Sequence, residues 1–128
     1  MPVFYGASAF NGNIAKWQTS AVVNMVVTFS GASAFNGDLS KWQTGAVVSM
    51  YETFRYAKSF NGDISKWQTT SCTNMQSIFF ESGFTRTLCG GAWESIRGAN
   101  NAFDNLGTSG SSTARLGCCP IGSFMSNP

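Results

Sequence analysis

The chain has 128 residues, which suits one domain with a modest core. Only 11% of its residues are charged, the net charge is +2, and the scattered basic residues exclude the clustered positive face of a nucleic-acid-binding domain. No apolar stretch reaches the roughly 20 residues of a membrane-spanning helix, and the sequence contains no histidine, the commonest general base and metal ligand.

A 25-residue repeat begins at the start of the chain. Phe-Asn-Gly, Lys-Trp-Gln-Thr and single Met and Phe residues recur at this interval, and 16 of 25 positions are identical between residues 1–25 and 26–50. We predict complete units at 1–25, 26–50 and 51–75 and a partial unit at 76–84. One unit cannot bury its own apolar face, so stacked neighbours are expected to form a continuous core.

Each unit predicts a turn, a short strand and a helical segment. Asn11-Gly12 and its copies mark a turn, because both residue types tolerate positive φ. Residues such as Asp38–Trp42 suit a short strand. The helical segment is predicted from apolar residues spaced along one helix face: Val47, Met50, Tyr51, Phe54 and Ala57. The period and these elements predict a leucine-rich-repeat-like solenoid of about three and a half coils.

The C-terminal part, residues 85–128, breaks the period and predicts an irregular cap that contains cysteines. Cys72 takes an apolar helix-face position and is expected to be a buried free thiol. A structural disulfide is predicted between Cys89 and either Cys118 or Cys119, and the clustered cysteines indicate an oxidising compartment. A redox pair or a metal site is the alternative for the last two, although their spacing matches no zinc pattern.

The repeat resembles that of the BspA-like leucine-rich-repeat surface proteins of bacteria, mycoplasmas and algae. The resemblance is carried by the segment 60–67, which reads Phe-Asn-Gly-Asp-Ile-Ser-Lys-Trp, and by Thr69, Met75 and Phe79 at their positions after it. It implies a leucine-rich-repeat-like fold, a cell-surface location and adhesive or protein-binding roles without enzymatic activity. Gln follows each Trp where the family usually has Asp or Asn, which puts any ligand of another member in doubt.

Three polar rows form the candidate binding surface, for which the alternative is a structural role: threonines that cap helical segments and lysines that keep the face solvated. These rows are Lys16, Lys41, Lys66; Gln18, Gln43, Gln68; and Thr19, Thr44, Thr69. The Asn row at 11, 36 and 61 is expected to form an internal ladder that satisfies backbone groups. The Trp row at 17, 42 and 67 is expected in the core, although an exposed row would stack on sugars or other ligands.

A second candidate interface lies at the N-terminal end. Met1 aligns with Val26, so the chain begins in the middle of a unit and nothing before it caps the first coil. Either a longer array or a partner chain would cover this end, and we expect the chain to self-associate or to bind a partner through Phe4, Tyr5, Phe10 and Trp17.

These patterns favour a non-catalytic protein-binding or adhesion module of a surface or secreted protein. The alternative is a structural scaffold or linker subunit packed permanently into a larger assembly, including a membrane-associated one. We expect no enzyme activity, cofactor or metal, since no nucleophile–base constellation or carboxylate-rich loop is visible. A protein partner is expected, with a glycan or other surface ligand as the alternative. The expected location is extracellular or on the cell surface, and the alternative is an organelle lumen or the periplasm.

Overall fold

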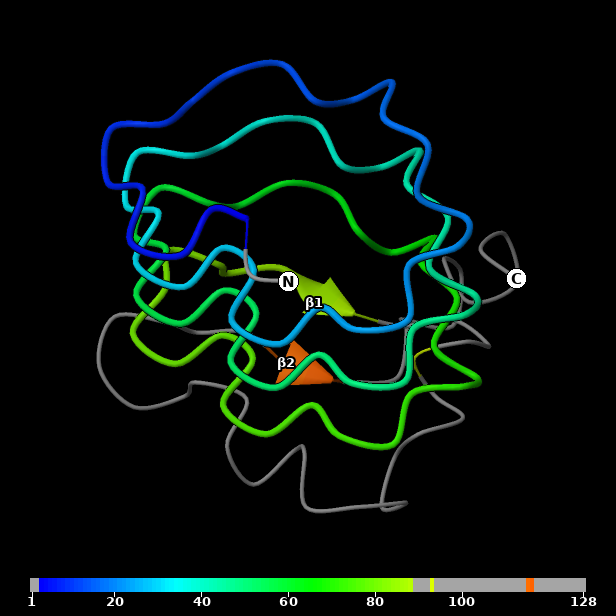
Figure 1. The fold of residues 1–128 in the computed structure, drawn as a ribbon. Coiled ribbons are helices and arrows are strands. Elements are labelled where there is room, and N and C mark those ends of the chain that lie inside the picture. Colours follow the sequence, from blue (N-terminus) through cyan, green and yellow to red (C-terminus); the bar gives the residue numbers. More distant parts are fainter. Residues whose placement is uncertain (1–2, 89–92, 94–114, 117–128) are drawn as a thin grey trace, which may run out of the picture.

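The computed structural model describes residues 3–88, 93 and 115–116. Along them the chain winds round repeatedly, and the blue, cyan and green windings in Figure 1 lie one over the next. We call each 25-residue winding a coil. In the described residues the strands are β1 (Thr87–Leu88) and β2 (Arg115–Leu116), which pair in parallel with Leu88 opposite Leu116.

Neighbouring coils are joined by backbone hydrogen bonds of fixed offset. Met25 N donates to Ser49 O at 2.9 Å, and one coil later Met50 N donates to Asn74 O at 2.8 Å. Isolated parallel bridges link Asn24 to Ser49 and Ser49 to Asn74. Because each coil hydrogen-bonds to the next in the same register, equivalent residues of successive coils lie beside one another.

The segment Val47–Ala57, expected to be helical, instead contains an isolated bridge at Ser49 followed by consecutive turns over residues 51–56. Thr53 N donates to Met50 O within the coil at 3.2 Å, whereas alternate amides donate to the next coil. A right-handed helix requires negative φ throughout, but φ is 53° at Glu52 and 61° at Tyr56. The expected apolar face is nevertheless largely inside, because Val47, Met50, Phe54 and Ala57 are all buried.

The short strand expected over Asp38–Trp42 is not formed either. A turn occupies Ser40 and Lys41, and Trp42 N donates to Leu39 O at 3.1 Å. The carboxylate of Asp38 accepts hydrogen bonds from the backbone N and from Oγ of Ser40, at 2.9 and 2.6 Å. This local bonding gives the backbone an alternative to strand pairing.

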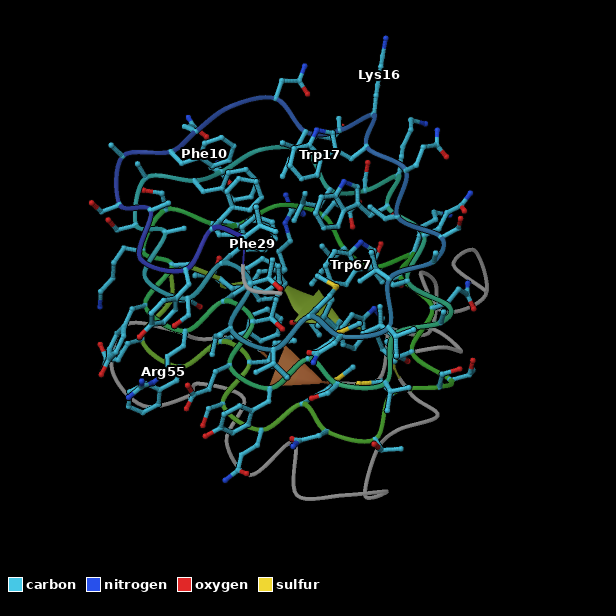
Figure 2. The ribbon with its side chains drawn as sticks, in the orientation of Figure 1. Phe10, Lys16, Trp17, Phe29, Arg55 and Trp67 are labelled. Carbon is cyan, nitrogen blue, oxygen red and sulfur yellow. The ribbon has the colours of Figure 1, made fainter. Side chains whose placement is uncertain are left out.

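Stacked phenylalanine rings form the centre of the core. Phe54 is fully buried, and its ring lies 5.4 Å from that of Phe29, 4.2 Å from Phe60 and 5.9 Å from Phe79, near parallel to each. Figure 2 shows Phe29 and Trp67 inside the coils, whereas Lys16 points away from them. Rings of this size dominate buried apolar area, so this column is the main source of cohesion between coils.

The glycine of each Asn-Gly pair serves ring packing rather than a positive φ. Positive-φ glycines in the described residues are Gly6 and Gly31, so the left-handed turn predicted at Asn-Gly does not occur. A Cβ added at Gly37 would lie 2.7 Å from the ring of Phe35, closer than real Cβ contacts. The glycine therefore makes room for the phenylalanine two residues before it.

The asparagine row forms the predicted ladder, but at the surface. Asn11 Oδ1 accepts a hydrogen bond from Asn36 N, and Asn36 Oδ1 accepts one from Asn61 N, both at 2.9 Å. Asn61 Oδ1 continues the row by accepting from Thr85 N at 2.9 Å. Asn11 and Asn36 are exposed and Asn61 is half-buried, so the amides fasten the coils along an outer edge.

Candidate functional site

The first two members of the exposed Lys and Gln rows surround an open groove of about 380 Å³. Five of the nine residues predicted for the binding surface line this groove: Lys16, Gln18, Thr19, Lys41 and Gln43. Ala15 and Trp17 complete the lining. Lys66 and Gln68 are exposed but do not line the groove. Trp17 is 49% exposed, so the groove combines an accessible aromatic ring with cationic and amide side chains.

The prediction that the threonine row is part of an exposed binding surface is wrong, because its members are buried. Thr19 is 6% exposed, Thr44 1% and Thr69 0%. Thr44 Oγ1 accepts a hydrogen bond from Gln68 N at 2.9 Å and donates one to Gln68 O at 3.0 Å. Thr19 Oγ1 likewise accepts from Gln43 N at 2.8 Å. These hydroxyls join the backbones of neighbouring coils, which is neither the surface contact nor the helix cap expected.

The tryptophan row lies mainly in the core. Trp42 and Trp67 are 8% and 1% exposed, and Trp93 is fully buried. The indole N–H of Trp67 donates to Leu39 O at 2.9 Å, and those of Trp42 and Trp93 donate to carbonyls at equivalent positions. Trp17 is the exposed member, stacked 6.5 Å from Trp42.

The predicted N-terminal interface is partly internal. Phe4 is only 8% exposed and stacks on Phe10 at 4.3 Å, whereas Tyr5 is 64% exposed. Beside Phe4 and Trp17 lies a small apolar pocket of about 110 Å³ that extends to Met25. Of the four predicted residues, Tyr5 and Trp17 are exposed, Phe10 is half-buried and Phe4 belongs to the core.

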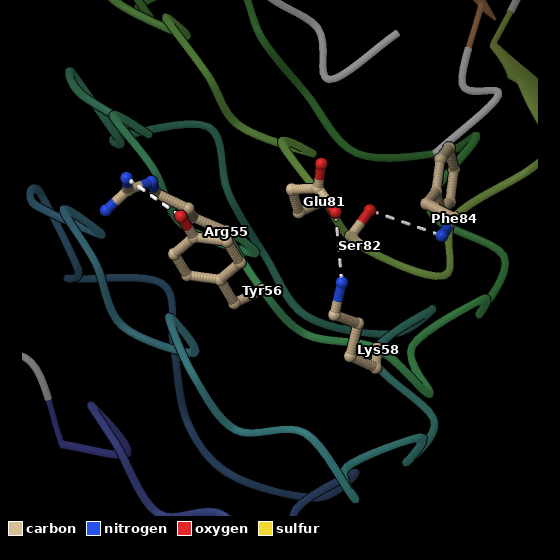
Figure 3. A network of polar contacts seen from close by, with 6 residues as sticks. All are labelled: Arg55, Tyr56, Lys58, Glu81, Ser82 and Phe84. Atoms are coloured by element: carbon tan, nitrogen blue, oxygen red, sulfur yellow. Dashed lines mark hydrogen bonds and ion pairs between the residues drawn. The ribbon is translucent and has the colours of Figure 1, made fainter. Parts of the chain in front are cut away.

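A further cluster lies on the outer turns of the third and fourth units, where no binding residue was expected (Figure 3). The Arg55 guanidinium lies 4.5 Å from the centre of the Tyr56 ring and 5.5 Å from that of Phe80. Lys58 Nζ contacts a carboxylate oxygen of Glu81 at 3.1 Å. The available sequence signal was departure from the repeat, because these positions carry Ser, Gly and Ser in the second unit.

The carboxylates of the repeat turns have structural partners. Asp63 Oδ1 accepts from Ser65 N at 3.0 Å, as Asp38 accepts from Ser40. These hydrogen bonds from the following serine lower the pKa of both carboxyls, because they favour the charged form. Turn formation therefore accounts for both side chains.

Cys72 is a buried free thiol, as expected, and burial raises its pKa. The predicted disulfide partners Cys89, Cys118 and Cys119 lie outside the described residues. Within residues 3–88, 93 and 115–116, no group of three or more His, Cys, Asp or Glu side chains is placed to hold a metal ion. No helix in this part of the chain is long and apolar enough to cross a membrane.

The stacked coils and their exposed side chains define a repeat protein with polar surface rows. A family model described as "Mycoplasma protein of unknown function, DUF285" matches residues 1–93, and the chain belongs to this family. No curated protein and no solved structure matches the chain.

Proposed function

We propose that the chain is a non-catalytic, protein-binding module with a leucine-rich-repeat-like solenoid fold, of the BspA-like kind, on a surface or secreted protein. The constant offset of the bonds from Met25 N to Ser49 O and from Met50 N to Asn74 O supports the solenoid. An extracellular or cell-surface location accords with the repeat resemblance, and an organelle lumen or the periplasm is the alternative.

The groove beside Trp17 is the observation that carries the binding proposal. An accessible aromatic ring flanked by a few polar groups is typical of protein recognition sites. Here the ring of Trp17 is accompanied by the ammonium groups of Lys16 and Lys41 and the amides of Gln18 and Gln43. The amides can donate hydrogen bonds to an extended backbone and can also accept hydrogen bonds from it.

The charge of the groove indicates the kind of partner. Ion pairs among the described residues join Arg55 to Glu52 and Lys58 to Glu81, and involve no lysine of the groove. The cations of Lys16 and Lys41 therefore remain available to carboxylates of a partner. We propose an extended protein segment with acidic side chains as the ligand, with a glycan as the alternative.

Selection from a phage-displayed random-peptide library on the purified chain tests this proposal. We expect enriched peptides to carry acidic and aromatic residues, and to bind the Trp17→Ala and Lys41→Ser variants at least about 10-fold more weakly. Lys66→Ser is the matched control, because it removes one positive charge from an exposed lysine of the same row that does not line the groove. Urea unfolding of each variant verifies that the fold is retained.

Two outcomes would overturn the groove as a protein-binding site. One is the absence of any peptide enriched above a control protein of the same net charge. The other is enrichment of peptides that bind both groove variants as tightly as they bind the unaltered chain. Binding of an oligosaccharide array that is lost on Trp17→Ala would replace the peptide by a glycan.

A structural subunit is the second candidate function, and exposed apolar side chains of the first unit favour it. Val3, Tyr5 and Val23 are 59%, 64% and 54% exposed. Such side chains suit a permanent contact when they cover a continuous area. Sedimentation velocity discriminates the two: a monomer unaffected by Tyr5→Ser favours the binding module, and a stable oligomer lost on that substitution favours the subunit.

A further inference from the structure

The outer turns of the third and fourth units carry an aromatic cluster whose charges are already paired. It consists of Glu52, Arg55, Tyr56, Lys58, Phe80 and Glu81, which we call the Arg55 patch. Tyr56 is 40% exposed and contacts Phe80 edge to face, with ring centroids 5.9 Å apart. Arg55 Nη2 donates to Tyr56 Oη at 3.3 Å, and Figure 3 shows the guanidinium beside the tyrosine ring.

The backbone at this patch makes Tyr56 and Glu81 costly choices for the fold. They occupy the repeat position that holds Gly6 and Gly31 in the first two units, and all four residues have positive φ, between 55° and 77°. Side chains with a Cβ are disfavoured in this conformation. Tyr56 is exposed, so its ring adds little to the core in return.

We propose that the Arg55 patch is a second protein-binding site, which takes a charge-neutral segment presenting an aromatic or aliphatic side chain to Tyr56 and Phe80. Tyrosine and arginine are, with tryptophan, the residue types that most often dominate the energy of protein interfaces. Lys58 and Glu81, whose side chains are 49% and 28% exposed, form a polar rim beside the rings.

The charge arrangement distinguishes this partner from anionic ligands. Arg55 Nη1 lies 3.7 Å from Glu52 Oε2, and Lys58 Nζ lies 3.1 Å from Glu81 Oε1. An anionic polymer or lipid surface would have to displace or approach these carboxylates, whereas a neutral segment would not. The guanidinium also lies over the Tyr56 ring, which leaves less of that ring for a sugar to stack on.

This inference rests on the proposed protein-binding function but not on the groove beside Trp17. The two sites differ in their expected response to salt. Ligands of the lysine groove should bind more weakly at high ionic strength, because screening weakens attraction between exposed charges. Ligands of the Arg55 patch should retain their affinity, since the proposed contact is with the rings of Tyr56 and Phe80 and the charges of the patch are already paired.

Peptide selection in about 0.5 M NaCl, where exposed charges are strongly screened, tests the patch directly. The probe is a phage-displayed random-peptide library on the full chain. We expect neutral peptides with aromatic or aliphatic residues, which bind Tyr56→Gly at least about 10-fold more weakly than the unaltered chain. Tyr56→Gly is chosen because glycine occupies the same position at Gly31, so the coil is expected to keep its conformation.

Two further variants complete the test. Ser20→Ala, an exposed substitution away from the patch, should leave peptide affinity unchanged. Tyr56→Phe should retain most of the affinity, because it keeps the ring and removes only the hydroxyl that accepts from Arg55.

The proposal is overturned if high-salt selection yields no enrichment, or yields peptides that bind Tyr56→Gly without loss. Selection of acidic peptides that are lost on Arg55→Ser, or binding to vesicles of anionic phospholipid with the same loss, would assign the patch to anions instead. If the high-salt peptides do not depend on Tyr56 while the low-salt peptides still depend on Trp17, the groove proposal is retained and the patch proposal is rejected.

Discussion

The inside of the coils and their outer turns differ in how far they follow the 25-residue period. Phe29, Phe54 and Phe79 are identical, fully buried and stacked on one another. Two positions after Phe29 and Phe54 the residues are Gly31 and Tyr56, which share a positive φ but no side-chain chemistry. Stacking therefore keeps the inner residue a phenylalanine, whereas the outer position accepts different side chains at a backbone cost and can acquire a binding role.

Polar side chains divide in the same way. Thr44 repeats Thr19 because its hydroxyl has two backbone partners in the next coil. Lys58 stands where the second unit has Ser33, and its partner Glu81 has Gly31 as its equivalent there. A repeated polar residue whose side chain bonds the backbone of the next coil, such as Thr44, is thus a ladder element, whereas a residue of the outer turns that departs from the repeat is a candidate for recognition.

The largest effect should come from the phenylalanine column. Phe54→Ala removes a ring packed against three others and should lower the free energy of unfolding by about 3–5 kcal/mol. Urea-induced unfolding followed by tryptophan fluorescence measures this loss. Tyr56→Ala, two residues away, should cost far less, and equal losses would contradict the division between inner and outer positions.

The buried hydroxyl ladder should give the next largest effect. Thr44→Val keeps the shape but removes one hydrogen bond accepted from Gln68 N and one donated to Gln68 O, which should cost about 1–3 kcal/mol. Thr70→Val is the matched control on an exposed threonine, and we expect a change within about 0.5 kcal/mol. If both variants have the same urea midpoint, Thr44 has no bridging role.

At Tyr56, where φ is positive, glycine should stabilise the fold more than alanine, which reverses the usual order of stability of these two residues. Tyr56→Gly and Tyr56→Ala lose the same aromatic contacts, so their difference reports the backbone alone. Glycine should be the more stable by about 1 kcal/mol, because φ is 61° there. Ala57→Gly is the control: its buried methyl group makes glycine the less stable choice. Thermal unfolding of these three variants and of the unaltered chain tests whether the backbone at Tyr56 is strained.

The sequence pattern anticipated which side chains are inside better than it anticipated their backbone. Apolar spacing identified Met50, Phe54 and Ala57, all buried, although the segment is not helical. Helical spacing succeeds here because tight turns also bring every third or fourth residue to one side. The positive φ of Glu52 and Tyr56 depends on bonding to the next coil, which local spacing does not reveal.

The candidate site was anticipated in part for a similar reason. Exposed Lys and Gln side chains could be placed on one surface, and several do line the groove. Thr44 was wrongly predicted to lie on the surface. The partners of its hydroxyl lie 24 residues later in the sequence, and only the stacking of the coils brings them close to it. The Arg55 patch was not predicted because the candidate residues were chosen from those that repeat, whereas the residues of the patch differ from those at the equivalent positions of the second unit.

The smallest expected effect concerns the turn carboxylates and is visible mainly in acid. The pKa of Asp63 is lowered in the folded chain by hydrogen bonds from Ser65, so its stabilisation is present above the ordinary value of 3.8 and is lost as pH falls through the lowered pKa. Asp63→Asn keeps an acceptor without this titration, as Asn13 does when it accepts from Ala15 N at 3.1 Å. The variant should therefore lose less stability than the unaltered chain between neutral pH and the acid range below 3.8. Urea midpoints across this range measure the difference, and the reciprocal Asn13→Asp should increase the acid sensitivity. Parallel pH profiles for all three chains would show that the carboxylate adds nothing beyond what the amide supplies.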